Sequence, residues 1–505
     1  MEEENVPTSH KMVLEGFILP FEGKLDANNR WVKLAEIIPW STIEKDYADL
    51  FPSNTGTVAK PLRMALGALI IKEKCGFTDR ETVEQITENP YLQYFIGLEK
   101  YQIEPPFDPS LMVHFRKRLD KETLNKINEL ICQGKQTKEP KDPDEHGGHP
   151  NPGGTLPEQD SKPAEPINKG KLLLDATCAP ADIRYPTDLS LLNEAREKTE
   201  EIIDTLYHTG LGLKRKPRTY RQNARRDYLK IAKQKKPRGK VIRKAIGKQL
   251  SYLCRNLKII DLLLNLEGHG NLSARQSREL ATIRTLYSQQ QEMYTNKIHQ
   301  IKDRIVSICQ PHVRPIVRGK AKANTEFGAK VAVSMVDGYI YVDHLSWDSF
   351  NESCDLQQAV ENYKERFGFY PEAVLADKIY RNRDNRSYCK KHGIRLSGPP
   401  LGRPPRDGRP NKELEKQDMK ERNEIEGGFG VGKRRYGLAR IMARLKETAE
   451  SVIMLQFLVI NLDRRLRSLF YHFLCTFLEG IFGQNADKKH SIMFFKPSRV
   501  NFGSY

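Results

Sequence analysis

Two aspartates in the sequence follow short apolar runs. Asp175 comes directly after Leu-Leu-Leu at residues 172–174, and Asp377 after Val-Leu-Ala at residues 374–376. A continuous apolar run is typical of a strand that is buried on both faces. An aspartate at the end of such a strand needs a cation or a dense set of hydrogen bonds, because buried carboxylates are rarely left without partners. The sequence therefore predicts two strands, each of which ends at a carboxylate.

A third carboxylate belongs to a segment that carries both signs of charge. Arg422 lies four residues before Glu426, and Lys433 lies seven residues after it. On a helix, these spacings place all three side chains on one face. A carboxylate between two cations suits a site that holds both a metal ion and phosphates. The alternative is a solvated helix face with surface ion pairs, and the two aspartates favour the first interpretation.

The three acids together indicate metal-dependent phosphodiester chemistry. In α/β sheets, active residues collect at the carboxyl ends of strands, so Asp175 and Asp377 would meet if their strands were neighbours. Hard oxygen ligands select Mg²⁺ or Mn²⁺. Two such ions, about 3.5–4 Å apart, can activate a nucleophile and stabilise the leaving oxygen. We therefore expect Asp175, Asp377 and Glu426 to be metal ligands for two ions of Mg²⁺ or Mn²⁺.

Composition indicates a polyanionic partner. The 505 residues carry a formal net charge of +18, which is typical of proteins that bind nucleic acid. The eight cysteines are scattered without a CxxC pair, so a disulfide framework is not expected and a reducing compartment fits. Neither a secretory signal nor an apolar stretch long enough to cross a bilayer is present, and we expect a cytoplasmic protein without membrane contact.

The positive charge is most concentrated between Lys214 and Lys248. This stretch contains sixteen lysines and arginines and a single acid, Asp227, with Tyr220 and Tyr228 among them. Cations for phosphates, together with aromatic rings for stacking, predict nucleic-acid binding. The alternative is a solvated basic face. The candidate DNA contacts in this stretch are Arg221, Arg225, Arg226 and Lys230.

The first part of the chain has a helical pattern. Thr78 followed by Glu81 predicts a capping box, and the helix it starts would stop before Pro90. Asp108-Pro109 predicts the start of another helix, whose Arg116 and Arg118 are candidates to contact DNA phosphates. Short helices with tight turns resemble a helix-turn-helix unit, and a plain helical bundle without DNA contact is the alternative.

These patterns divide the chain into six segments. The 133–170 segment is rich in Pro, Gly and charge, which is typical of a linker without a core. An Asp-Gly pair at 337–338 between two apolar runs predicts a hairpin. The expected order is a helical DNA-binding region over 1–132, a linker over 133–170, the first part of the catalytic domain over 171–189, a basic helical insertion over 190–318, the second part of the catalytic domain over 319–480 and a tail over 481–505.

The sequence resembles the DDE transposases of bacterial insertion sequences. Asp175 in Leu-Leu-Leu-Asp-Ala-Thr matches the first catalytic aspartate of that family, and Asp377 in Val-Leu-Ala-Asp-Lys matches the second. Glu426 matches the glutamate of the Tyr-(2)-Arg-(3)-Glu-(6)-Lys signature, with Arg422 and Lys433 in register. The tyrosine of the signature is replaced by Met419.

The resemblance implies a multidomain α/β protein. Its catalytic domain would have a ribonuclease-H-like mixed sheet, interrupted here by a large helical insertion and preceded by an all-α N-terminal domain. The implied activity is cleavage of double-stranded DNA at terminal inverted repeats and joining of the freed 3′ ends to target DNA, with a homodimer bound to DNA. Arg422 and Lys433 would hold phosphates at the scissile end. A catalytically inactive DNA-binding relative and a metal-dependent nuclease of the same fold are the alternatives.

Four glycines follow Glu426 within the predicted helix, at 427, 428, 430 and 432. Each should weaken a helix by roughly 1 kcal/mol relative to alanine. Either the helix bends there, or DNA or another backbone comes too close for a Cβ atom. The second explanation is the one we expect.

Overall fold

The structure is a computed structural model. The residues that it describes are 18–19, 23–48, 59–133, 168–211, 213, 215–267, 272–317, 325–398 and 412–482. Most of the expected linker, residues 134–167, and most of the expected tail, residues 483–505, lie outside the described residues.

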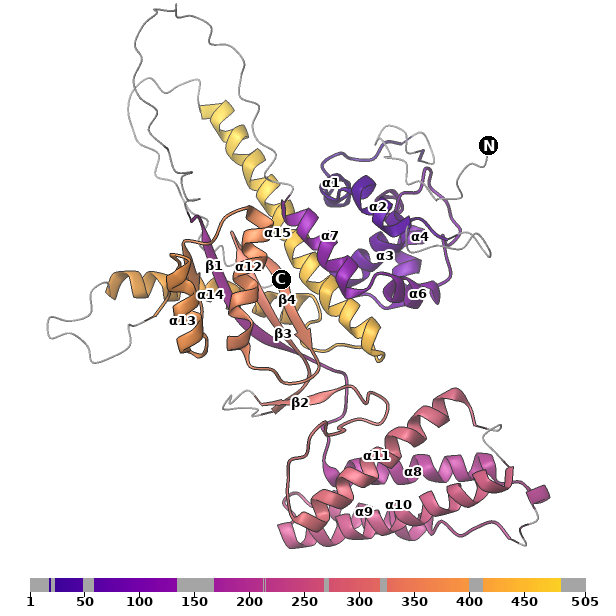
Figure 1. Ribbon diagram of the computed structural model, residues 1–505. Coiled ribbons are helices and arrows are strands. Elements are labelled where there is room, and N and C mark those ends of the chain that lie inside the picture. Colours follow the sequence, from indigo (N-terminus) through magenta and orange to yellow (C-terminus); the bar gives the residue numbers. More distant parts are fainter. Residues whose placement is uncertain are drawn as a thin grey trace, which may run out of the picture.

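In the described part of residues 1–133, the chain forms seven short helices (Figure 1). The predicted capping box is confirmed, since the Thr78 side chain accepts a hydrogen bond from the backbone N–H of Glu81 at 3.2 Å and the Glu81 side chain bonds back. The next helix starts at Pro90, as Pro at a first helical position allows. The helices are α1 (Arg30–Ile37), α2 (Trp40–Ala48), α3 (Leu62–Cys75), α4 (Asp79–Glu88), α5 (Pro90–Phe95), α6 (Leu111–Arg118) and α7 (Lys121–Gln133).

A mixed sheet forms the centre of the molecule. Strand β1 pairs antiparallel with β3 on one side and parallel with β5 on the other, and β5 pairs parallel with β6. Both β4 and β2 pair antiparallel with β3. The predicted hairpin is confirmed, because Asp337 and Gly338 join β3 to β4 with φ angles of 49° and 78°. The strands are β1 (Lys171–Pro180), β2 (Arg314–Val317), β3 (Thr325–Val336), β4 (Tyr339–Ser346), β5 (Ala373–Leu375) and β6 (Arg395–Leu396).

Alternate side chains of β1 enter two different cores, as the two-residue repeat of a strand requires. Leu172 and Leu174 pack into a cluster with residues of α12 (Leu356–Phe367). Leu173 packs into a second cluster, which includes residues of α14 (Lys412–Arg435) and α15 (Lys446–Phe482). The sheet is therefore covered on both faces, which explains why the apolar run of β1 is continuous.

Helix α15 joins the sheet to the N-terminal helices. It contacts α3, α6 and α7 as well as β4, and Figure 1 shows it running diagonally between them. Asn461 of α15 donates to the carbonyl of Ile340 in β4 at 2.7 Å and to Oδ1 of Asn128 in α7 at 2.8 Å. These buried polar bonds fix three elements that are distant in sequence.

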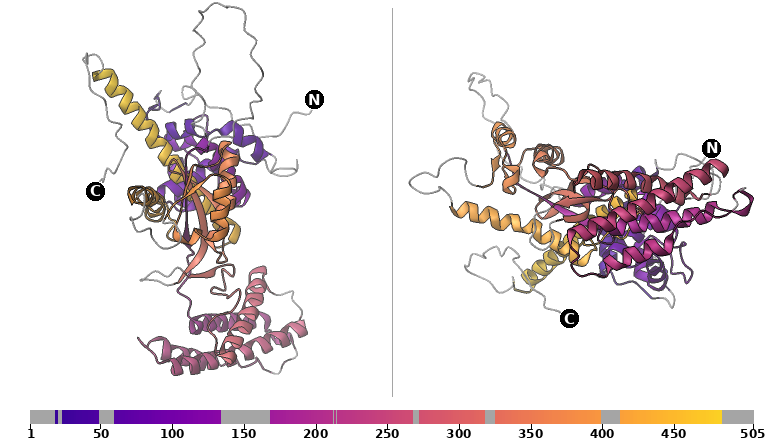
Figure 2. Two further views of the ribbon diagram at one scale, coloured as in Figure 1. Left: turned by 60° about the vertical axis from the view of Figure 1, so that its left-hand side comes forward. Right: turned by 90° about the horizontal axis from the view of Figure 1, so that it is seen from below.

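A bundle of four helices interrupts the sheet between β1 and β2. It comprises α8 (Asp188–Leu206), α9 (Arg221–Ala232), α10 (Gly239–Glu267) and α11 (Ala274–Asn296). The bundle has its own apolar core, with Leu192, Leu253 and Ile283 at its centre. Figures 1 and 2 show it set apart at one end of the sheet. None of the helices in the described part of the chain is long and apolar enough to cross a membrane.

Candidate active site and nucleic-acid interface

The strand register places Asp175 beside Asp377. Leu173 pairs with Leu375 in the parallel β1–β5 ladder, and each aspartate lies two residues further along its own strand direction. The prediction that Asp175 ends its strand is wrong, because β3 remains paired with β1 as far as Pro180. Strand β5, the parallel neighbour of β1, ends at Leu375. Asp175 therefore lies just beyond the end of its neighbouring strand, on the side of β1 that faces β5.

Helix α14 brings Glu426 to this edge. The helix packs on β1 and β5 through buried Ile425 and Phe429. Arg395 of β6 anchors it by donating two hydrogen bonds to the carboxylate of Asp418, at 2.6 and 2.9 Å. Glu426 is left 55% exposed, compared with 59% for Asp377.

The guanidinium of Arg422 lies between two of the acids. It is 3.4 Å from Oδ1 of Asp377 and 3.8 Å from Oε1 of Glu426, one helical turn away. The pKa of Asp175 is raised to about 6, mainly by burial and also by the charges of Glu352 and Glu426, whereas the hydrogen bond from the Ala176 N–H and the charge of Arg422 lower it. The three predicted acids and Arg422 therefore share one electrostatic environment. Lys433, near the end of the same helix, is half-buried.

Sequence reasoning missed Glu352. This residue begins a short 3-10 helix, Glu352–Cys354, which contacts the turn Lys378–Tyr380 that follows Asp377. Its carboxylate is 2.8 Å from Nζ of Lys330. Neither an apolar run nor a helical spacing marks Glu352 in the sequence, so only the tertiary fold reveals it.

The donor set has the chemistry of a divalent-cation site. Carboxylate oxygens are the ligands that Mg²⁺ and Mn²⁺ prefer, and a cation would relieve the repulsion that Glu352 and Glu426 exert on half-buried Asp175. Among the described residues, however, no three His, Cys, Asp or Glu side chains are close enough together to hold a metal ion. The carboxylate oxygens of Asp175, Asp377 and Glu426 are thus of the type that binds Mg²⁺ or Mn²⁺, but in this structure they are not close enough to coordinate one ion together.

The glycines after Glu426 lie in an unbroken helix, and they divide into two kinds. A Cβ at Gly428 would come within 2.9 Å of Ile340, and one at Gly432 within 3.1 Å of Ile460 and 3.2 Å of Leu438. At Gly427 a Cβ would meet nothing within 4 Å. Close packing of the protein's own side chains, and not of another backbone, therefore accounts for two of the four positions.

We expect Gly427→Ala to raise the free energy of unfolding by about 0.5–1 kcal/mol, because alanine favours the helix and meets open space. Gly432→Ala is the matched control in the same helix. There the added methyl must displace Ile460 or Leu438 and should give no gain. Urea denaturation of both variants measures the difference, and equal stabilisation by the two substitutions would contradict this account of the packing.

Arg116 and Arg118, both expected at DNA, have different surroundings. Arg116 is buried and donates to both carboxylate oxygens of Asp79, at 2.9 and 2.6 Å. This pairing inside the protein removes Arg116 from the surface that we propose for DNA. The side chain of Arg118 is exposed.

We expect Arg116→Ala to lower the free energy of unfolding by about 1.5 kcal/mol, since the partly exposed Asp79 loses two short hydrogen bonds but keeps Lys72 at 3.3 Å. Arg118→Ala should change stability by less than about 0.5 kcal/mol, as is usual for a surface substitution. Urea denaturation of the two variants tests this contrast, and a stable Arg116→Ala protein would show that the ion pair has no structural role.

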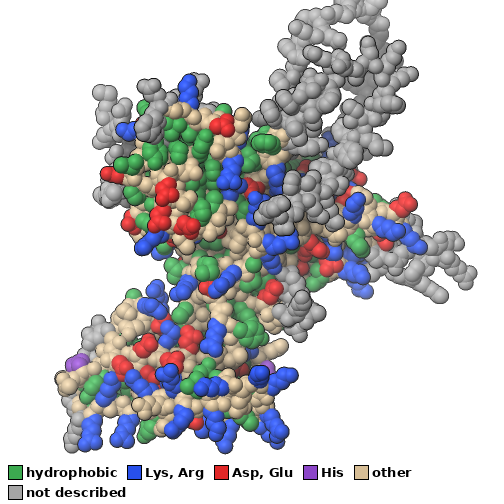
Figure 3. Space-filling view, turned by 180° about the vertical axis from the view of Figure 1, so that it is seen from behind, with side chains coloured by type: hydrophobic (Ala, Val, Ile, Leu, Met, Phe, Trp, Pro, Cys, Tyr) green, Lys and Arg blue, Asp and Glu red, His purple; other side chains and the backbone are tan. Residues whose placement is uncertain are grey.

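Exposed cations gather on the helical bundle. Figure 3 shows Lys and Arg side chains along its lower edge. Arg225, Arg226 and Lys230 of α9 are all exposed. Arg221 instead donates two hydrogen bonds to Asp204, at 3.0 and 2.7 Å, and is partly neutralised. Lys214, where the predicted basic stretch begins, lies outside the described residues.

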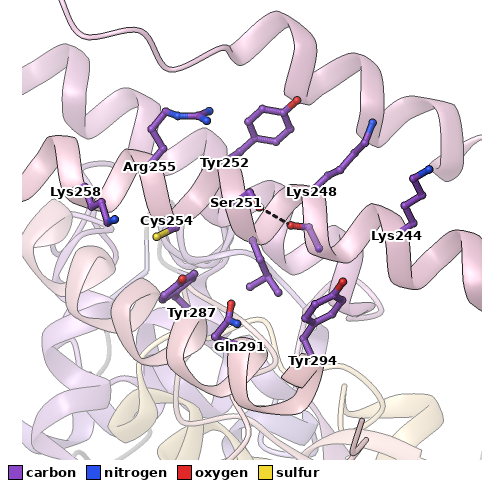
Figure 4. A pocket seen from close by; sticks show the side chains of 12 residues that line it. Lys244, Lys248, Ser251, Tyr252, Cys254, Arg255, Lys258, Tyr287, Gln291 and Tyr294 are labelled. Atoms are coloured by element: carbon purple, nitrogen blue, oxygen red, sulfur yellow. Dashed lines mark hydrogen bonds between the residues drawn. The ribbon is translucent and has the colours of Figure 1, made fainter. Parts of the chain in front are cut away.

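A groove between α10 and α11 extends this basic surface (Figure 4). Its volume is about 890 Å³. Arg255 and Lys258 lie beyond the predicted stretch, yet they continue the helical row of Lys244 and Lys248 along α10. That spacing was readable in the sequence. Tyrosines from both helices complete the lining, namely Tyr252, Tyr287 and Tyr294.

Comparisons with known proteins agree with the residue motifs. A family model described as a transposase DDE domain matches residues 374–463, the segment that contains Asp377, Arg422, Glu426 and Lys433. A second model, described as a transposase domain (DUF772), matches residues 19–118. The resemblance to DDE transposases is thereby confirmed.

One curated relative is a protein of Rhizobium meliloti described as uncharacterized protein ORF8 in nfe locus. It is 29% identical over 180 residues, which cover 35% of this chain and 75% of the relative. No solved structure matches the chain. The class of protein thus rests on the two matched transposase segments.

Proposed function

We propose that the protein is a transposase that binds the terminal inverted repeats of its element, cleaves DNA at those ends and joins the 3′ ends to target DNA. The observation that carries this proposal is the β1–β5 register, which places Asp175 beside Asp377 under the helix that bears Glu426. These three acids correspond to the catalytic residues of the family that the sequence resembles.

The strand order supports a ribonuclease-H-like catalytic domain. The order β4–β3–β1–β5–β6 combines an antiparallel half with a parallel half, and the proposed acids lie where the two halves meet. The helical bundle would then be an insertion into this domain. The segment boundaries at 132, 170, 189, 318 and 480 remain part of the proposal.

Asp175, Asp377 and Glu426 would hold Mg²⁺ or Mn²⁺. When bound, such ions polarise phosphoryl oxygens and lower the pKa of a coordinated water. Arg422 and Lys433 would bind phosphates at the scissile end, because both belong to the helix that carries Glu426. Burial of Ile425 and Phe429 fixes the rotation of that helix, and with it the direction of the glutamate.

DNA would contact two further surfaces. The basic face of α9 and α10, together with the groove that contains Arg255 and Lys258, would track phosphates. The helices that include α6, with exposed Arg118, would read the terminal repeat. Recognition of two inverted ends favours a homodimer on double-stranded DNA, since a two-fold protein matches a two-fold site.

Strand transfer tests the proposal against its alternatives. Purified protein would be incubated with Mn²⁺, a supercoiled plasmid and a labelled duplex from the DNA flanking the gene. A transposase gives labelled ends joined to the plasmid. A nuclease of the same fold gives cleavage without joined product, and an inactive DNA-binding relative gives a bound complex without cleavage; either outcome would contradict the proposal.

A further inference from the structure

The ion pairs of helix α14 fall into two geometric groups. Arg395 holds Asp418 through two bonds of 2.6 and 2.9 Å, and Lys171 lies 2.7 Å from Glu421. These are the short distances of charge-assisted hydrogen bonds. Arg422 is 3.4 and 3.8 Å from its two carboxylates. The first group attaches the helix to the sheet, whereas Arg422 is held mainly by charge at longer range.

The position of Arg422 explains why the acids are not gathered. Its guanidinium lies between Asp377 and Glu426 and occupies the place of a cation that both carboxylates would share. Its charge also acts on Asp175. The side chain is 24% exposed, so it can leave without any movement of the anchored helix.

We infer that Arg422 is an exchangeable counter-ion, which neutralises the acidic site in the free protein and releases it when a DNA phosphate binds the guanidinium. This inference rests on the proposed metal role of Asp175, Asp377 and Glu426. Arg422 carries a single positive charge, so a bound phosphate dianion or diester competes with the two carboxylates for that charge and for its N–H donors. Phosphate binding would therefore increase the affinity of the carboxylates for a divalent cation.

The same coupling must work in both directions. If DNA raises the affinity for Mn²⁺ by a given factor, Mn²⁺ raises the affinity for DNA by the same factor. Couplings between two sites commonly amount to roughly 5- to 150-fold.

The test is a titration of the full-length protein with Mn²⁺, in which electron paramagnetic resonance measures free Mn²⁺ with and without a duplex from the DNA flanking the gene. Asp175→Asn, measured in parallel with the same DNA, gives the background from ions held by DNA alone. We expect DNA to increase the Mn²⁺ affinity of the Asp175-dependent site by about tenfold. Arg422→Ala should bind Mn²⁺ about tenfold more tightly than the unsubstituted protein without DNA, and DNA should then add less than about threefold.

Lys420→Ala is the matched control. It removes one positive charge from an exposed position of the same helix, two residues away and therefore on a different face. It should leave Mn²⁺ affinity unchanged. Thermal unfolding of Arg422→Ala close to that of the unsubstituted protein shows that the fold is retained.

Three results would overturn the inference. If Arg422→Ala binds Mn²⁺ no more tightly than Lys420→Ala does, Arg422 does not compete with the cation. If Arg422→Ala binds Mn²⁺ more weakly than the unsubstituted protein, the arginine supports the metal site instead of blocking it. If the unsubstituted protein shows no Asp175-dependent Mn²⁺ binding even with DNA, the proposed metal role itself fails, and that result is distinguishable from the other two.

Discussion

Asp175→Asn should reduce cleavage of DNA ends by about 10³-fold or more, while duplex affinity measured without divalent cations stays within about twofold. The neutral amide keeps the size of the side chain but loses the charge that holds a divalent cation, and loss of a major electrostatic contribution of this kind costs about 10²–10³ in rate or more. Binding depends on cations that meet phosphates, and Asp175 is not one of them. A nicking assay with Mn²⁺ and an electrophoretic mobility assay in EDTA, on the same preparation, measure the two effects.

Asp348→Asn is the control for Asp175→Asn. Asp348 lies in the same part of the chain, is highly exposed and, among the described residues, forms a 3.6 Å ion pair with Arg314. Its substitution should leave both assays unchanged. Nicking by Asp175→Asn at the rate of this control would remove Asp175 from the active site.

The second large effect concerns the salt dependence of DNA binding. Replacement of Arg225, Arg226 and Lys230 with alanine should flatten the slope of log affinity against log salt by up to about 2.7 units, because each neutralised phosphate contributes about 0.9. Affinity should fall for terminal-repeat and random duplexes alike, since phosphate contacts carry no sequence information directly. Arg221 is left in place because Asp204 already holds it.

A triple substitution elsewhere controls for the change in net charge. Arg383, Lys390 and Lys391 of α13 (Arg383–Lys391) are exposed and lie outside the proposed DNA surfaces. Alanine at these positions removes the same three charges and should leave the slope nearly unchanged. If the two triple variants behaved alike, α9 would be a solvated helix face. If the α9 variant lost discrimination but kept general affinity, the sequence-reading element would lie in the bundle and not in the N-terminal helices.

The features that could be predicted from the sequence are those that depend on a few neighbouring residues. The capping box at Thr78, the hairpin at Asp337-Gly338 and the apolar runs before Asp175 and Asp377 each depend on a few neighbouring residues, and the structure contains all of them. Such signals are readable because helix caps, tight turns and doubly covered strands each demand particular residue types.

The remaining features depend on contacts between distant segments. Arg116 and Arg118 are alike in the sequence, and only the approach of Asp79 makes one of them structural. Strand β1 passes Asp175 because β3, more than 150 residues later, continues to pair with it. Glu352 joins the site through a turn that no local pattern marks. The role of Arg116, the length of β1 and the position of Glu352 near the acids thus depend on tertiary contacts, which residue type and spacing do not reveal.

We propose that Asp175, Asp377 and Glu426 hold a divalent cation together once DNA is bound. The most direct measurement is an anomalous difference map from crystals of the protein–DNA complex grown with Mn²⁺. We expect a peak within about 2.0–2.6 Å of a carboxylate oxygen from each of the three residues, with Arg422 turned to a phosphate. A Mn²⁺ peak at other residues, or three carboxylates that stay apart around Arg422 with DNA in place, would contradict it.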